Sequence, residues 1–559
     1  MANHLKNKVS ELLAKNVHLK NLKKDKIASL IEIPPDPSLG DYAFPCFILA
    51  KDFKKNPSEI AEELAGKVSK ALPKEISGAK AINGYLNFFI DRKFLVENII
   101  NNVLKEKEKF GKGKEKGNIA LEHTSLNPNS SPHVGRARNS FLGDSLKRIL
   151  EFMGLKVETY YYVNDVSKQI AIMALDFGGK ETFEQLLDLY VKANKKLEQN
   201  PETEKRVFEL LSKFESGDKQ TTELFKKIVD IAVKGQKKIL EELGIKFDKF
   251  DYESKYIKSE KNILKDFEKT GKLFKDEEGR LVLNQEGFGL EAKMKSPVLV
   301  LARSNGTGLY PLRDIAYTLD KLKRCKKTYI VLGEDQKLYF DQIKTALKLL
   351  GKPSPEVIHY SYVLIQTGEG AERMSTRKGE LVLLEDFMEE ARKKAEEEIA
   401  KRKTKGNAEK VGYGAVKYSI LKNEPNKNIV FNWQQALNFE GNSGPYLQYS
   451  YARANSIMKK AKAKPPVKIK ILSLAEKEIE LAKKLAEFPE AVKHAYSQLN
   501  PSLLANYSFQ LCQVFNEFYH ECQVVGSKEE SQRLAIVKAF MIVQKQALSL
   551  LGIDVLEEM

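Results

Sequence analysis

The sequence predicts a multidomain α/β protein whose central part is a doubly wound, Rossmann-like parallel sheet. The chain has 559 residues, which is too long for a single hydrophobic core. In its middle part, strand-like segments alternate with helical patterns, as they do in a parallel sheet with crossover helices. After about residue 386 the pattern is almost wholly helical. We therefore expect an α/β centre between an N-terminal α+β domain and an all-α C-terminal domain.

Residues 1–105 are expected to form the α+β domain. Helical patterns surround "IEIPPDPSLGDYAF", and "INGYLNFFI" alternates between apolar and polar positions as a strand does. The charged, glycine-containing segment 106–117 is expected to be a linker.

Residues 118–385 are expected to form the central domain. Its strand candidates are "NIALEH", "KVETYYYV", "PVLVLAR", "KTYIVLG" and "EVIHYSYVLI", and a helix is expected from about Pro132 to Met153. A mostly charged helical stretch at about 176–290 interrupts the alternation, so we interpret it as an insertion. A connecting helical region (386–440) and a helical domain (441–559) are expected to follow.

The composition limits the partners. A net charge of +17 favours a polyanion such as nucleic acid. No apolar run could span a bilayer and no signal peptide is evident, so we expect no membrane contact. The four cysteines are scattered without a CxxC pair, which argues against a zinc site or a disulfide framework and favours a reducing cytoplasm. We expect no protein-bound metal.

A strand, a loop and a helix start meet at "SPHVGRARNS", residues 131–140. Pro132 suits the first turn of a helix, and the free N–H groups of a helix start attract phosphate. Gly135 would let a flat base approach the backbone, His133 can donate a hydrogen bond to a phosphate oxygen, and Arg136 adds positive charge. Taken alone, the pattern also fits an ordinary, partly buried histidine.

The second charged motif is "RMSTRKG", residues 373–379. Arg373, Arg377 and Lys378 alternate with Ser375 and Thr376. A basic loop of this kind can close on a triphosphate and stabilise charge that develops during transfer. Taken alone, it fits a basic surface loop equally well.

Together the two motifs resemble the signatures of class I aminoacyl-tRNA synthetases: "HVGR" resembles "HIGH" and "RMSTRKG" resembles the "KMSKS" loop, in the same order. The stretches similar to arginyl-tRNA synthetases in particular are "PSLGDYAFPCFILAK", "GLYPLRDIAY", "EGNSGPYLQYSYARANSI", "FNEFYHECQVV" and "LLGIDVLEEM". The resemblance covers nearly the whole chain and is weakest in the insertion.

The resemblance implies an arginine–tRNA ligase. Such an enzyme joins arginine to ATP, releases pyrophosphate, and moves the arginyl group to the 2′-OH of the terminal adenosine of tRNA(Arg). The attacking carboxylate is already a nucleophile, so positioning and charge stabilisation suffice. ATP is expected as a substrate accompanied by Mg²⁺, and the protein is expected to be a cytoplasmic monomer.

The resemblance also implies site residues. The candidates for ATP binding and catalysis are His133, Gly135, Arg136, Arg373, Met374, Ser375, Arg377 and Lys378. A guanidinium needs planar acceptors, and the candidates for the arginine pocket are Glu122, Asn127, Tyr310, Asp314, Gln336, Asp165 and Gln169. The candidates for tRNA contact, from the domain that resembles the anticodon-binding domain, are Tyr449, Tyr507, Phe515, Tyr519 and Met559. Most aromatic residues in helical patterns are core residues, so this last set keeps a packing alternative. The N-terminal domain is expected to bind tRNA as well.

Several positions depart from the family pattern. Ser130 and Thr376 stand where lysine is common, Ser167 stands for a glycine, and Arg136 replaces the second signature histidine. We hypothesise that Arg136 and Lys378 together restore the missing positive charge at the phosphates.

Three other functions compete with this interpretation. A related class I enzyme for lysine or cysteine is the first, although the zinc ligands of the cysteine enzyme are missing. A non-catalytic tRNA-binding paralogue is the second, but it would be expected to have lost a motif or a domain. A plain nucleotidyltransferase would lack the helical C-terminal half.

Overall fold

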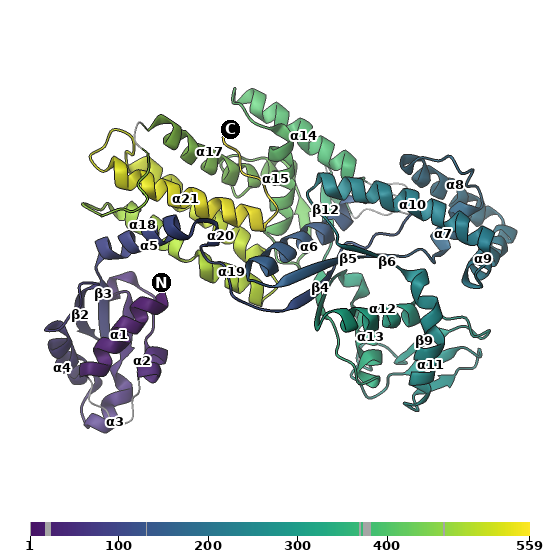
Figure 1. Ribbon diagram of the computed structural model, residues 1–559, viewed down its shortest axis with the longest axis horizontal. Helices are drawn as coiled ribbons and strands as arrows, with labels where there is room; N and C mark the ends of the chain where they lie inside the picture. Colours follow the sequence, from purple (N-terminus) through teal and green to yellow (C-terminus); the bar gives the residue numbers. More distant parts are fainter. Residues whose placement is uncertain (1, 17–23, 130, 368–369, 373–381, 462–463) are drawn as a thin grey trace. The chain divides into compact units, whose positions relative to one another are not determined.

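The structure is a computed structural model that describes residues 2–16, 24–129, 131–367, 370–372, 382–461 and 464–559 (Figure 1). It divides into two compact units. The first consists of Met1–Phe110, Ala454–Pro489 and Gln510–Gln544, and the second of Gly111–Arg453, Glu490–Phe509 and Lys545–Met559.

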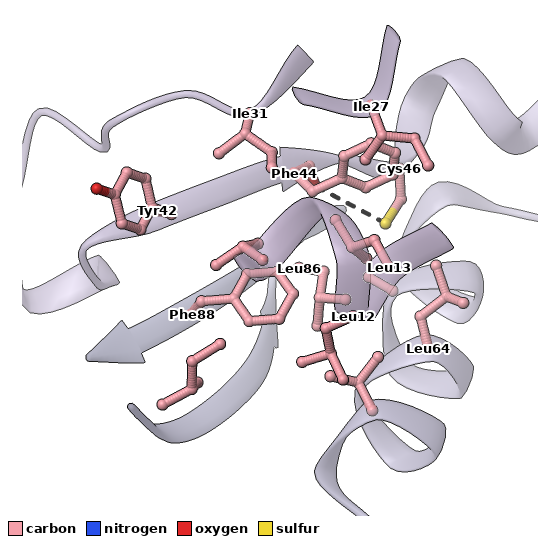
Figure 2. Packing of buried hydrophobic residues seen from close by; sticks show 14 of the residues in the cluster. Leu12, Leu13, Ile27, Ile31, Tyr42, Phe44, Cys46, Leu64, Leu86 and Phe88 are labelled. Carbon is pink, nitrogen blue, oxygen red and sulfur yellow. Dashed lines mark hydrogen bonds between the residues drawn. The ribbon is translucent and has the colours of Figure 1, made fainter. Parts of the chain in front are cut away.

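The N-terminal part of the first unit has the predicted α+β fold. Its strands form an antiparallel sheet in the order β1-β3-β2. They are β1 (Tyr42–Pro45), β2 (Ile76–Ile82) and β3 (Tyr85–Ile90). The helices are α1 (Ala2–Asn16), α2 (Lys24–Leu30), α3 (Ala50–Phe53), α4 (Pro57–Ser69) and α5 (Arg92–Glu106). Figure 2 shows the core that joins sheet and helices, with Phe44 and Phe88 from the sheet meeting Leu12 of α1 and Leu64 of α4.

The second unit contains the predicted doubly wound sheet. All five strands are parallel, in the order β11-β10-β4-β5-β6. They are β4 (Asn118–Glu122), β5 (Lys156–Val163), β6 (Lys249–Tyr252), β10 (Lys327–Gly333) and β11 (Glu356–Tyr360). The chain leaves β4 toward β5 and leaves β10 toward β11, so the winding direction reverses between the central neighbours β4 and β10. A reversal of this kind opens a crevice at the carboxyl ends of the strands.

The helices of this unit include the one predicted from about Pro132 to Met153, which is α6 (Val134–Phe152). The helices between β5 and β6 are α7 (Lys168–Ala174), α8 (Phe183–Gln199), α9 (Pro201–Glu215) and α10 (Lys219–Glu242). Those that follow β6 are α11 (Glu260–Glu268), α12 (Tyr310–Arg324) and α13 (Lys337–Leu349). The crossover helix α6 packs against β4, β5 and β10.

One strand lies outside the sheet in which the alternation placed it. "PVLVLAR" forms β9 (Val298–Ala302), but β9 pairs antiparallel with β8 (Leu281–Asn284), which pairs antiparallel with β7 (Leu273–Lys275). The prediction of a parallel strand here is wrong, because an apolar run specifies burial and not the direction of its neighbour. "EVIHYSYVLI" likewise divides into β11 and β12 (Val363–Thr367), and β12 pairs with β13 (Gly370–Glu372) and β14 (Ile429–Phe431) in a separate sheet.

The C-terminal part is helical, as predicted. Its helices are α14 (Leu384–Lys401), α15 (Ala408–Leu421), α16 (Trp433–Ala436), α17 (Gly444–Lys460), α18 (Glu476–Ala486), α19 (Phe488–Ser497), α20 (Ser502–Glu521) and α21 (Glu530–Leu550). None of the helices that the structure describes is long and apolar enough to cross a membrane.

Candidate active site at the carboxyl edge of the parallel sheet

A cavity of about 420 Å³ lies where the winding of the parallel sheet reverses. It is lined by Glu122, the last residue of β4, by Gly333, the last residue of β10, and by Tyr162 near the end of β5. This is the position at which doubly wound sheets bind their ligands. We name it the edge cavity.

The edge cavity brings together predicted residues from both substrate sets. Those that line it are Glu122, Asn127, Arg136, Tyr310, Asp314 and Gln336. They come from the end of β4, the loop after it, the first turns of α6 and α12, and the turn after β10. Segments far apart in the sequence thus converge, because parallel strands end at one edge of the sheet.

The first two turns of α12 carry Tyr310 and Asp314, which with Glu122 form what we name the acidic wall of the cavity. Tyr310 and Asp314 are four residues apart and therefore share a helix face. The hydroxyl of Tyr339 donates a hydrogen bond to Asp314 Oδ2, and the rings of Tyr310 and Tyr339 lie 5.2 Å apart between centroids. Desolvation raises the pKa of Asp314 to about 6, against the lowering effect of the Tyr339 hydroxyl. Asp314 is therefore ionised at neutral pH and can accept a cationic donor.

The second carboxylate of the cavity has a partner that sequence reasoning missed. Lys321 donates a hydrogen bond to Glu122 Oε2, and its Nζ lies 4.0 Å from the centroid of the Tyr317 ring. Tyr317 in turn stacks on Tyr162 with centroids 4.3 Å apart. A signal was present, since Lys321 follows Asp314 by seven residues, or two helical turns, which places both on one face of α12.

Arg313, the residue before Asp314, stabilises the acidic wall. The buried guanidinium of Arg313 donates to Glu253 Oε1 at 2.6 Å and to Glu260 Oε1 at 3.1 Å. Burial raises the pKa of Glu253 to about 8, and Arg313 opposes that shift. These contacts attach the start of α12 to the segment that follows β6, and so fix Tyr310 and Asp314 at the cavity.

The loop after β4 has a strained backbone at the cavity. Thr124 and Ser125 both line it and have φ of 71° and 43°, values that non-glycine residues seldom adopt. Asn139 of α6 holds this conformation: its Oδ1 accepts the Thr124 N–H at 2.8 Å and its Nδ2 donates to the Val331 carbonyl at 3.0 Å. Strain of this kind often marks a functional site.

The structure does not bring Asp165 and Gln169 into the edge cavity. The carboxylate of Asp165 accepts the backbone N–H of Ser254 at 2.9 Å and its hydroxyl at 2.6 Å, and Asp165 lines a separate cavity of about 350 Å³. Gln169 lies half-buried in α7 and lines neither cavity. Asp165 thus binds the segment after β6, and the arginine contacts of Asp165 and Gln169 remain predictions that the edge cavity does not support.

The start of α6 carries the first predicted ATP motif. His133 is the N-cap residue, and its Nδ1 is buried without a hydrogen-bond partner among the described residues. Burial, helped by the neighbouring charge of Arg136, lowers the pKa of His133 to about 4, so the imidazole is neutral at pH 7. A Cβ on Gly135 would lie only 3.0 Å from the His133 ring, so the glycine lets the ring occupy this place.

The second predicted ATP motif lies outside the described residues, and with it Arg373, Met374, Ser375, Arg377 and Lys378. The described segment that follows it pairs with the start of α6. The Val134 N–H donates to the Val382 carbonyl at 3.1 Å and the Leu384 N–H to the Pro132 carbonyl at 2.7 Å, around a bridge between His133 and Leu383. The chain on the carboxyl side of the second motif therefore lies against the first.

Arg138 holds the second turn of α6 in place. It is fully buried, and its guanidinium donates to the carbonyls of Ser361 at 2.8 Å, Lys427 at 2.7 Å and Glu424 at 2.7 Å. These carbonyls belong to the segments before β12 and β14. Arg138 thus joins α6 to the segments that lead into β12 and β14, which lie before and after the second motif in the sequence.

The predicted tRNA contacts differ in exposure. Tyr519 is 40% exposed, and Tyr449 and Met559 are partly exposed. Tyr507 is buried, and Phe515 is fully buried against Phe540 with ring centroids 3.8 Å apart. The burial of Phe515 and Tyr507 favours the packing alternative for both, and base stacking remains a prediction for the exposed and partly exposed candidates.

Comparison with known proteins extends over the whole chain. Residues 99–433 match the family model "tRNA synthetases class I (R), catalytic domain", residues 447–559 match "DALR anticodon binding domain", and residues 3–90 match "Arginyl tRNA synthetase N terminal domain".

Individual relatives agree with these models. The chain is 40% identical to an arginine–tRNA ligase of Methanocaldococcus jannaschii, covering 99% of this chain and 98% of the relative, and 38% identical to that of Methanococcus aeolicus, covering 94% and 95%. The solved arginyl-tRNA synthetase of Thermus thermophilus superposes with a TM-score of 0.77 at 28% identity, over 100% of this chain and 99% of the other. The Plasmodium falciparum enzyme, at 20% identity and a TM-score of 0.75 over 99% of each chain, shows the fold alone. These matches, together with the edge cavity and the backbone pairing of residues 382–384 with the start of α6, establish that the chain belongs to the arginyl-tRNA synthetases of class I.

Proposed function

We propose that this chain is an arginine–tRNA ligase that activates arginine with ATP and transfers it to the 2′-OH of the terminal adenosine of tRNA(Arg). The observation that carries the proposal is the edge cavity, where the carboxylates of Glu122 and Asp314 lie within reach of one ligand beside the start of α6. A guanidinium is the cation that two carboxylates on different elements suit best, because its donors point outward in one plane.

The polar groups of the cavity suggest an orientation for arginine. The guanidinium would lie between Glu122 and Asp314, with the exposed ring of Tyr310 over it. Asn127 and Gln336 also line the cavity and can bind the α-amino and α-carboxylate groups. In this orientation the substrate carboxylate faces the nucleotide rather than the acidic wall.

The activation step needs positioning and charge stabilisation. One carboxylate oxygen of arginine attacks the α-phosphorus of ATP, the bond to the bridging oxygen breaks, and pyrophosphate leaves with that electron pair. The positive dipole end of α6 is suited to the phosphates, while the Val134 and Arg136 N–H groups already donate to the carbonyls of Val382 and His133. Arg136 contributes a fixed charge, and neutral His133 can donate one hydrogen bond without proton transfer.

Mg²⁺ would accompany the nucleotide. Among the described residues no group of three or more histidine, cysteine or acidic side chains could hold a metal ion. A magnesium ion that keeps most of its waters needs only phosphate oxygens and one or two protein ligands, and the phosphates would bring it to the site.

The second step requires tRNA, and the net charge of +17 favours a polyanion. The C-terminal helical domain would bind the anticodon and the N-terminal domain another part of the tRNA. We further propose that the protein acts as a monomer in the cytoplasm.

The experiment that tests the function offers the purified protein tRNA, ATP, Mg²⁺ and each of the twenty labelled amino acids in turn. We expect attachment of arginine to tRNA. Predominant attachment of another amino acid would overturn the substrate, and tRNA binding without attachment of any would identify a non-catalytic paralogue. Sedimentation with and without tRNA tests the monomer.

A further inference from the structure

The edge cavity contains one place suited to an ammonium ion, and the chain's own Lys321 occupies it. The Lys321 ammonium donates to Glu122 Oε2 and lies 4.0 Å from the centroid of the Tyr317 ring. A carboxylate beside an aromatic face is a strong ammonium site. The Lys321 side chain is only 1% exposed, so its ammonium can reach water only if the side chain leaves the core.

Two carboxylate oxygens remain for a ligand. Glu122 Oε2 is taken by Lys321 and Asp314 Oδ2 by Tyr339, whereas no described residue donates to Glu122 Oε1 or to Asp314 Oδ1. These two acceptors belong to different elements, β4 and α12. A guanidinium can donate to both from separate edges of its plane, while an ammonium has three donors on one atom.

We propose that Lys321 is a specificity-determining residue that excludes ammonium side chains, lysine above all, by filling the place that an ammonium would take. The inference rests on the proposed activation of arginine. A pocket rejects a competitor by making its binding unfavourable as well as by favouring the substrate. A lysine ligand meets Lys321 as a like charge at Glu122, and an arginine ligand uses the oxygens that Lys321 leaves open.

The formal charges of the residues that line the cavity agree with one guanidinium. Glu122 and Asp314 contribute two negative charges and Lys321 one positive charge, and the charges of Arg136 and Asp335 cancel each other, which leaves a single negative charge for a singly charged side chain. The neighbouring Glu253 is bonded to Arg313. Without Lys321 the acidic wall would have two uncompensated carboxylates and an empty ammonium place.

The test compares Lys321→Met with Lys323→Met, a matched charge removal at an exposed position of the same helix. L-Lysine and L-norleucine are each measured as competitive inhibitors of arginine attachment, and the KM values for arginine and ATP are recorded. In Lys321→Met we expect the Ki of lysine, relative to the KM for arginine, to fall at least tenfold. The Ki of norleucine and the KM for ATP should not change, and Lys323→Met should match the parent protein.

A second comparison keeps the test informative if Lys321→Met does not fold, since it leaves Glu122 buried without its partner. Glu122→Gln alone leaves the Lys321 ammonium opposed only by Asp314 and should bind arginine poorly. The double variant Glu122→Gln/Lys321→Met restores one net negative charge. Its kcat/KM for arginine should exceed that of Glu122→Gln at least tenfold, an increase that a purely structural lysine would not produce.

An unchanged lysine Ki in folded Lys321→Met, or a double variant no better than Glu122→Gln, would overturn the role of Lys321. Failure of the proposed function is a different result, because the parent protein would then attach no arginine at all.

Discussion

The buried guanidinium of Arg138 donates a 2.8 Å hydrogen bond to the carbonyl of Ser361, 223 residues further along the chain. Arg138→Met should leave this carbonyl and those of Lys427 and Glu424 without their donor, and so lower the free energy of unfolding by about 3–5 kcal/mol. Urea denaturation measures the change. Lys323→Met, on the surface, should stay within about 0.5 kcal/mol of the parent; a similar result for Arg138→Met would show that these bonds do not stabilise the fold.

Asp314 should control the pH dependence of arginine use. Its pKa is raised to about 6, so the carboxylate is neutral below that pH and ionised above it. The kcat/KM for arginine should therefore rise with pH through about 6 and then level off. Tyr339→Phe removes a hydrogen bond that lowers this pKa, so the rise should move to higher pH.

Asp314→Asn supplies the reference for that titration. It should lose the rise near pH 6 and lower kcat/KM for arginine by about 3 kcal/mol, or roughly 100-fold, with little change in the KM for ATP. A rise that persists near pH 6 in Asp314→Asn would assign it to another group.

Lys378 is predicted, with Arg136, to supply charge that lysine provides elsewhere in the family. Lys378→Ala should slow ATP–pyrophosphate exchange, measured with tRNA present, by at least about tenfold, or about 1.4 kcal/mol of barrier. Lys401→Ala, at an exposed position of α14, is the control. A smaller loss in Lys378→Ala would exclude Lys378 as the substitute.

Gly552 should be intolerant of a side chain. Its φ is +67°, and a Cβ would lie 2.7 Å from Asp144 Oδ2. Gly351, at φ +65°, also follows a helix, but a Cβ there would have no atom of the described residues within 4 Å. In both alanine variants a non-glycine residue must adopt left-handed backbone angles, which lowers the free energy of unfolding by about 1 kcal/mol. Gly552→Ala should cost at least about 1 kcal/mol more in urea denaturation, and equal losses would show that the contact with Asp144 relaxes freely.

Tyr519 and Phe515 should separate tRNA binding from stability. Tyr519→Ala removes an exposed ring and should raise the KM for tRNA on the order of tenfold with little effect on unfolding. Phe515→Ala should lower the free energy of unfolding by about 3–5 kcal/mol and leave the KM for tRNA unchanged where the protein is folded. The reverse pattern would place Phe515 at the tRNA.

The sequence was informative where local chemistry determines position. The apolar pattern after Pro132 predicted α6, although the helix begins at Val134 and Pro132 lies before the N-cap rather than in the first turn. The alternation of strands and helices predicted the parallel sheet at whose edge Glu122 and Asp314 meet. The partners of these carboxylates could not be predicted, because Lys321 and Tyr339 reach them only through tertiary packing. For the same reason, helical periodicity gave Phe515 and Tyr519 the same expectation although one is buried and the other exposed.

The pairing of Val134 and Leu384 with Val382 and Pro132 uses only main-chain atoms. Such bonds are indifferent to the identity of the residue, with proline as the exception among donors. The contact at the start of α6 therefore tolerates a change of side chain within "HVGR", such as the arginine at position 136, because no side chain takes part in these bonds.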